Sequence, residues 1–207
     1  CSFMSCAEDT AVEDPYANWQ VRNEHYIDSI ADVARANVEG NWEIYRNYKV
    51  QNANSLPGLG GGLVVDNPYE KSASAADSVY MKVLEPGNLE GQTPLFTDSV
   101  RVYYQGRLIN GEIFDGYTGV LNEEVHESKT LPLQASQTSG GDWLILGWIT
   151  ALQQMKEGQK VELYVPSALG YGVGDDKVPA NSTLIFDLKL EKVIHPKGIE
   201  QYSLKVD

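Results

Sequence analysis

The sequence predicts an α+β fold in which a short helix lies across one face of an antiparallel sheet, after a helical N-terminal extension. Three observations lead to this prediction. Residues 143–171 first repeat apolar side chains at helical spacing and then change to strict alternation. Alternating apolar and polar residues at 78–84, 98–106 and 183–193 indicate further strands. Residues 18–40 keep returning apolar side chains to one helical face.

The stretch 143–171 contains the central helix and the strand that follows it. We expect the helix to end at Gly158, because glycine readily adopts the conformation that terminates a helix. The strand occupies 160–165 and ends at Pro166, which has no N–H to donate to a sheet. The apolar face of the helix is formed by Trp148, Ile149, Leu152 and Met155.

The N-terminal helix is expected to begin after Asn18 as its N-cap and to stop at Gly40. Its apolar face needs a covering partner, which can be the aromatic segment 42–50, the remainder of the chain or a second copy. Packing within a monomer is preferred here over a dimer.

The remaining chain is organised by turns. Asn110-Gly111 predicts a two-residue hairpin, since both residues tolerate positive φ. In the strand at 98–106, Val100, Val102 and Tyr104 are expected to share one face. We expect residues 116–142 to form a long polar loop. The predicted organisation is an acidic flexible tether at 1–16, a helical extension and linker at 17–70, the main domain at 78–194, and a C-terminal tail at 195–207.

Composition excludes several function classes. The formal net charge is −13 and the isoelectric point is near 4.6, which disfavours binding to nucleic acid or to an anionic lipid surface. Cys1 and Cys6 are the only cysteines, so neither a disulfide framework nor a cysteine nucleophile is expected in the folded part. There is no apolar run of about 20 residues that could span a bilayer.

Conventional catalytic groups are also missing from the pattern. His25, His126 and His195 are isolated in the sequence, and no catalytic triad or paired carboxylates can be assembled by spacing. The glycines within 55–63 lack the strand and helix that a nucleotide-binding loop requires. We therefore expect no metal and no cofactor, and a hydrolase or metalloenzyme is disfavoured.

The order of WLILGW, ALGYG, Val178-Pro179 and TLIFDLKLEKV resembles that of FKBP-type peptidyl-prolyl cis-trans isomerases over roughly residues 78–194. This resemblance implies a strongly bent antiparallel sheet wrapped around the short helix, and isomerisation of the peptide bond before proline. Such a reaction fits the absence of acid–base groups, because no covalent bond breaks when an amide rotates.

The resemblance also implies the site. Its expected residues are Tyr104, Phe114, Asp115, Ile145, Trp148, Tyr171 and Phe186, with Leu144 and Val178 contacting the substrate. Trp148 would lie under the proline ring, with the other aromatic residues as walls. The Tyr171 hydroxyl and the Ile145 backbone N–H would donate hydrogen bonds to substrate carbonyls, and Asp115 would orient polar groups at the rim.

Two departures from the family pattern, a missing arginine and the long insertion at 116–142, support an alternative. Residues 116–142 contain no arginine to partner Asp115, and Lys129 is the only cation there. Leu131 or Leu133 replaces a usual aromatic residue. A module that binds proline-containing peptides or a partner protein without turnover is therefore a second hypothesis, and a purely structural lipoprotein is a third.

The N-terminal segment suggests a location. Phe3-Met4-Ser5-Cys6 resembles a bacterial lipoprotein cleavage box, which makes Cys6, or otherwise Cys1, a candidate for lipidation. The expected protein is a folding helper for exported proline-containing polypeptides. It would lie in the bacterial cell envelope, facing the periplasm or the cell exterior, with the lipid as its only membrane attachment.

Overall fold

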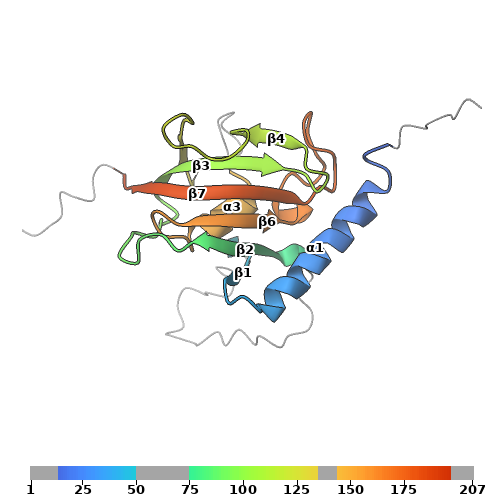
Figure 1. Cartoon of the computed structure of the whole chain (residues 1–207), viewed down its shortest axis with the longest axis horizontal. Coiled ribbons are helices and arrows are strands. Elements are labelled where there is room, and N and C mark those ends of the chain that lie inside the picture. The colour runs from blue at the N-terminus through green and yellow to red at the C-terminus, as the bar shows by residue number, and fades with distance from the viewer. Residues whose placement is uncertain (1–13, 50–74, 135–143, 197–207) are drawn as a thin grey trace, which may run out of the picture.

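A computed structural model describes residues 14–49, 75–134 and 144–196 (Figure 1). Its elements are α1 (Trp19–Ala36), β1 (Trp42–Arg46), η1 (Ala75–Asp77), β2 (Ser78–Glu85), β3 (Ser99–Arg107), β4 (Ile113–Gly116), β5 (Lys129–Pro132), α3 (Leu146–Leu152), β6 (Lys160–Val165), η2 (Ser167–Leu169) and β7 (Leu184–Ile194). The strands form one sheet in the order β1-β2-β6-β7-β3-β4, with β5 also paired to β3, and all pairs are antiparallel. The α+β prediction is therefore confirmed.

Helices α1 and α3 cover opposite faces of the sheet (Figure 1). Successive residues of a strand point to opposite faces, and β2 shows the consequence. Val79 and Met81 belong to the core around α3, whereas Tyr80 between them belongs to the core under α1. The sheet is thus buried on one face by the short helix and partly on the other by the N-terminal helix.

The α3 side holds the larger core. Trp148, Ile149 and Leu152 are buried there, as the helical spacing predicted. Gly147 permits the close approach of helix and sheet, because a Cβ at this position would lie 2.4 Å from Cγ1 of Val165 on β6. The site described below is built on this helix.

Helix α1 packs against the sheet of the same chain, on the face opposite α3. Ile27, Ala31 and Ala34 share a buried cluster with Trp42, Tyr80, Tyr164 and Ile185. Two buried polar contacts fix it further: the indole Nε1 of Trp19 donates to Ser182 Oγ at 2.9 Å, and the Thr183 N–H donates to Asn23 Oδ1 at 2.7 Å. The helix is thereby tied to the segment that leads into β7.

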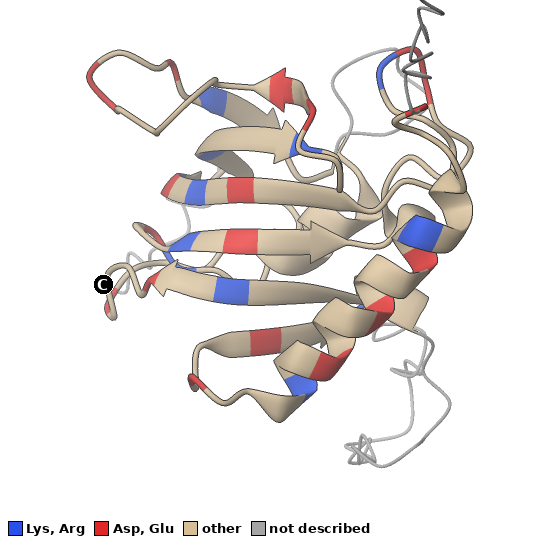
Figure 2. Ribbon diagram, turned by 45° about the vertical axis from the view of Figure 1, so that its right-hand side comes forward, with Lys and Arg blue, Asp and Glu red and all other residues tan. Residues whose placement is uncertain are grey.

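The part of this face that α1 leaves uncovered carries charges of both signs (Figure 2). Arg107 on β3 pairs with Asp187 on β7 at 2.9 Å and with Glu162 on β6. Because the three strands are neighbours, these pairs run across the sheet and leave little net charge there. The face has the character of a solvated surface and not of a charged binding site.

The structure corrects both predicted helix ends. α1 stops at Ala36, before Gly40, because Asn37 adopts a left-handed conformation (φ 42°). The Asn37 N–H donates to the Val33 carbonyl and closes the last turn. Asn18 precedes the helix, but its side chain makes no capping hydrogen bond. α3 stops at Leu152, so Met155 is buried from a turn beyond the helix and not from the helix itself.

Two further predictions about turns and strands were wrong. The Leu108 N–H donates to the Glu112 carbonyl at 2.9 Å, which leaves a three-residue loop, 109–111, between β3 and β4. Within it the Gly111 N–H donates to the Leu108 carbonyl, and Gly111 has φ 88°. Residues 116–142 are not all loop, since β5 pairs with β3 within them. In addition, β1 lies inside the predicted extension and adds an edge strand to the sheet by pairing with β2.

Several expectations concern residues outside the described ranges. These are residues 1–13 of the acidic tether, with Cys1 and Cys6, the glycine-rich linker, and most of the C-terminal tail. The end of the predicted tether is described and is not free of the fold, because the Tyr16 ring meets the Trp19 ring edge to face at 5.1 Å. Within the part that the structure does describe, no helix has both the length and the apolar content needed to cross a membrane.

Candidate functional site

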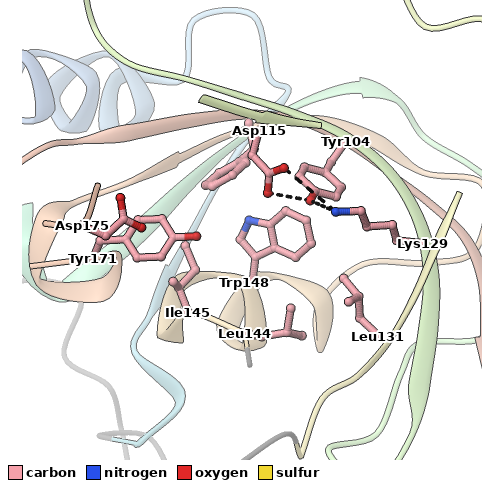
Figure 3. A pocket seen from close by; sticks show the side chains of 10 residues that line it. Tyr104, Asp115, Lys129, Leu131, Leu144, Ile145, Trp148, Tyr171 and Asp175 are labelled. Atoms are coloured by element: carbon pink, nitrogen blue, oxygen red, sulfur yellow. Dashed lines mark hydrogen bonds and ion pairs between the residues drawn. The ribbon is translucent and has the colours of Figure 1, made fainter. Parts of the chain in front are cut away.

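A pocket of about 290 Å³ opens where α3 meets β3, β4, β5 and the loop before β7 (Figure 3). Its lining is formed by Tyr104, Asp115, Lys129, Leu131, Leu144, Ile145, Trp148, Tyr171, Asp175 and Phe186. Segments that are far apart in the sequence thus contribute to one hollow. Seven of the nine predicted site residues line it: Tyr104, Asp115, Leu144, Ile145, Trp148, Tyr171 and Phe186.

The floor of the pocket is the Trp148 indole, which is only 4% exposed. The Tyr104 ring meets it edge to face at 4.9 Å between centroids, and the Phe186 ring does the same at 5.2 Å. Edge-to-face contacts between aromatic rings are favourable because the positive ring edge meets the negative ring face. Three rings from α3, β3 and β7 therefore hold one another in a fixed arrangement.

Phe114 lies behind this wall. It does not line the main pocket, but its ring contacts Phe186 at 5.7 Å and Tyr171 at 6.3 Å, both nearly perpendicular. It opens onto an adjoining hollow that shares Asp115, Tyr171 and Asp175 with the main pocket. Gly106 makes room for these rings, because a Cβ there would lie 2.7 Å from Phe114 and 2.9 Å from Phe186.

One side of the rim carries a polar network (Figure 3). The Tyr104 hydroxyl donates to Asp115 Oδ2 at 2.7 Å, and Lys129 Nζ donates to the Tyr104 hydroxyl at 2.8 Å. Lys129 Nζ also lies 4.0 Å from Asp115 Oδ1. The carboxylate expected to orient polar groups at the rim is thus itself held by a tyrosine and a lysine.

Tyr171 lies just after η2, on another side of the pocket. Burial raises the pKa of its hydroxyl above the usual value of 10.0, and the negative charges of Asp115 and Asp175 raise it further. A raised phenol pKa means that the proton stays on the oxygen at neutral pH. Tyr171 is therefore a hydrogen-bond donor over the whole physiological range.

Val178 and Asp175 shape the loop that carries this wall. Val178 is 1% exposed and belongs to the core, and it is not among the residues that line the pocket. Asp175 Oδ1 accepts the backbone N–H groups of Lys177 and Val178, both at 2.8 Å. Asp175 lines the pocket as well, although it is not among the site residues predicted from the sequence.

Lys129 and Leu131 reach the pocket from β5, a strand that was not predicted from the sequence. Leu131 lines the pocket, whereas Leu133 is fully buried in the core. The signal available in the sequence was weak, because only residues 129 and 131 share one face of this four-residue strand.

Nothing in the described part of the chain suggests a bound metal. No group of three or more His, Cys, Asp or Glu side chains is placed there to hold one. His25, His126 and His195 all lie away from the pocket lining. What the arrangement offers is an apolar aromatic floor with a few hydrogen-bonding groups at its edge, which suits a small apolar ring attached to polar peptide groups.

Comparison with known proteins places the same region in a family. Residues 91–191 match the family model described as FKBP-type peptidyl-prolyl cis-trans isomerase, and every residue of the pocket falls within this range. The probable FKBP-type isomerase FkpA of Neisseria meningitidis is 35% identical over 128 residues, which cover 60% of this chain and 41% of that protein. The isomerase Mip of Coxiella burnetii is 37% identical over 120 residues, covering 57% and 46%.

A solved isomerase structure from Pseudomonas syringae is 31% identical and has a TM-score of 0.46, with 56% of this chain and 76% of that chain covered. The matched region spans less than half the length of the Neisseria and Coxiella relatives. The chain belongs to the FKBP-type peptidyl-prolyl cis-trans isomerase family.

Proposed function

We propose that this protein catalyses the cis-trans isomerisation of peptide bonds before proline. The observation that carries the proposal is the pocket floored by Trp148 and walled by Tyr104 and Phe186, with the Tyr171 hydroxyl at its edge. The apolar floor binds the pyrrolidine ring of proline, and the hydrogen-bonding groups at the edge bind the peptide groups on either side of that ring.

The physical basis is the electronic change during rotation. The barrier of about 18–20 kcal/mol comes from amide resonance, which places partial charges on the oxygen and nitrogen of the planar bond. Twisting the bond removes this charge separation, so a water-poor pocket favours the twisted state over the planar one. Each ~1.4 kcal/mol of that preference increases the rate tenfold.

Hydrogen bonds add orientation to this effect. We assign the Tyr171 hydroxyl as donor to a substrate carbonyl and the Ile145 backbone N–H as a second donor, as the family resemblance implies. Ile145 has an extended backbone (φ −65°, ψ 152°) immediately before α3, so its N–H lies outside the helical hydrogen-bond ladder.

Replacing Tyr171 with phenylalanine tests the donor. The ring contact with Phe114 is kept and only the hydroxyl is removed. We expect kcat/KM for a proline tetrapeptide to fall about tenfold, the equivalent of one lost hydrogen bond of ~1.4 kcal/mol. In the wild-type protein, the raised pKa of Tyr171 predicts that its ionisation causes no loss of rate below pH 10.0.

A protease-coupled or exchange-NMR assay on a proline tetrapeptide tests the function itself. The wild-type protein is expected to speed an exchange that takes roughly 10–100 s without a catalyst. A wild-type rate equal to the background would refute the isomerase proposal. Saturable peptide binding without turnover would instead favour the non-catalytic alternative. One reason for that alternative was the missing arginine partner of Asp115. Lys129 supplies a cation 4.0 Å from Asp115, which weakens that reason.

We further infer that the substrates are exported polypeptides and that the protein is held in the bacterial envelope by a lipid on Cys6 or Cys1. The support is the resemblance of Phe3-Met4-Ser5-Cys6 to a lipoprotein cleavage box. The in-chain packing of α1 supports a monomer.

Mass spectrometry of the native protein tests the anchor. We expect an N-terminal peptide that carries diacylglyceryl and acyl groups on the cysteine, recovered from the membrane fraction. An unmodified cysteine in protein recovered from the soluble fraction would contradict this inference.

A further inference from the structure

We propose that Lys129 is a positioning residue of the isomerase site: it orients the Tyr104 hydroxyl, balances the charge of Asp115 and so holds the Tyr104 ring against the Trp148 floor. This inference rests on the proposed isomerase function. It concerns a residue that the family resemblance did not include among the site residues.

The backbone explains why Lys129 can reach this place. β5 pairs with β3 in a register that sets Lys129 opposite Val102, two residues before Tyr104. On the other side, β4 pairs with β3 so that Asp115 lies opposite Gly106, two residues after Tyr104. Tyr104 is therefore flanked by the two short strands, and its hydroxyl lies between the lysine and the carboxylate (Figure 3).

The direction of each hydrogen bond follows from chemistry. An ammonium group can only donate, and an ionised carboxylate can only accept. The Tyr104 hydroxyl therefore accepts from Lys129 at 2.8 Å and gives its single proton to Asp115 at 2.7 Å. The order Lys129, Tyr104, Asp115 is a directed chain, in which each charged end strengthens the bond at the other end.

Because the network lies at the pocket, it affects both the charge and the shape of the site in which the peptide bond rotates. Asp115 lines an apolar pocket that is to receive peptide carbonyl oxygens, and an uncompensated carboxylate would repel them. Lys129 Nζ, 4.0 Å from Asp115 Oδ1, offsets that charge. The Tyr104 ring is also the wall that meets Trp148 edge to face at 4.9 Å, so the orientation of its hydroxyl and the shape of the pocket are coupled.

The lysine side chain is 55% exposed, so solvent screens its charge and the expected effect is moderate. Lys129→Met is expected to lower kcat/KM about fivefold, mainly through kcat, while Lys129→Arg retains most of the activity. The effect should depend on Asp115: in an Asp115→Asn background, Lys129→Met should change kcat/KM less than about twofold.

Lys82→Met is the matched control. Lys82 also pairs with a carboxylate, Glu39, at 2.9 Å and lies over an aromatic ring, Trp42, at 5.9 Å, but on β2 and under the opposite face of the sheet. Its replacement is expected to leave kcat/KM unchanged. An equal loss of activity in Lys82→Met and Lys129→Met would show a general loss of charge or stability and overturn the proposal.

A second measurement does not depend on turnover. In ¹⁵N NMR spectra, Lys129→Met is expected to shift the indole N–H resonance of Trp148, and Lys82→Met is expected to leave it in place. If the wild-type protein shows no turnover, the function proposed above fails, and this resonance still decides whether Lys129 holds Tyr104 against Trp148. An unmoved resonance, or an equal effect of Lys129→Met with and without Asp115, overturns the positioning role.

Discussion

Replacing Trp148 with leucine is expected to lower kcat/KM for a proline tetrapeptide by about 30- to 100-fold, which corresponds to ~2–3 kcal/mol of lost transition-state stabilisation. The indole is the floor of the pocket and is 4% exposed. Leucine fills less of that volume and has no ring face for the edges of Tyr104 and Phe186. The walls would then relax toward the gap, and water could enter a site that depends on being dry.

Trp42→Leu separates this effect from lost stability. Trp42 is 9% exposed and stacks on Tyr164 at 5.6 Å, but it lies under α1 on the opposite face of the sheet. Both variants are expected to lower the free energy of unfolding by a comparable ~3 kcal/mol. Only Trp148→Leu should lower kcat/KM of the folded protein, and a similar loss in Trp42→Leu would argue against Trp148 as the floor of the active site.

Gly116→Ala is expected to lower the free energy of unfolding by about 3–4 kcal/mol, measured by urea denaturation. Gly116 has φ 89°, and a Cβ there would lie 2.1 Å from the carbonyl oxygen of Tyr104. That neighbour is backbone in the adjacent strand, so it can move only if the β3–β4 pairing opens. The pairing also carries Asp115, and kcat/KM should fall together with the stability.

Gly119→Ala provides the comparison for this prediction. Gly119 has a similar φ of 78°, but no atom lies within 4 Å of its Cβ position. Its replacement should therefore show only the strain of a left-handed residue with a side chain, ~1 kcal/mol. If both alanines destabilise the protein equally, the close approach of Gly116 to Tyr104 is not what holds β4 in place.

Much of the fold could be predicted because the decisive patterns are local. Alternation over 160–165 and 183–193 predicted β6 and β7, since a period of two can be read within a few residues. Helix ends were less predictable. Met155 completes a helical spacing, yet the chain leaves the helix at Leu152 and still buries Met155 from a turn. Burial and helical geometry need not end at the same residue.

Short elements were the main failure. β5 has four residues within a polar segment, too few to show a period, and it exists because β3 offers a partner. For the same reason Lys129 could be noted as a cation but not placed beside Tyr104 and Asp115. The three-residue loop around Gly111 was likewise set by the pairing of β3 with β4 and not by the Asn-Gly pair alone.

The sequence by itself determined which aromatic side chains would meet, because Tyr104, Trp148, Tyr171 and Phe186 stand in motifs whose order identifies the family. Only the tertiary structure decided how the rim of the pocket is charged and which face α1 covers. Those features depend on the register between strands and on contacts between residues far apart in the chain, and the free energies that select them do not appear in any local pattern.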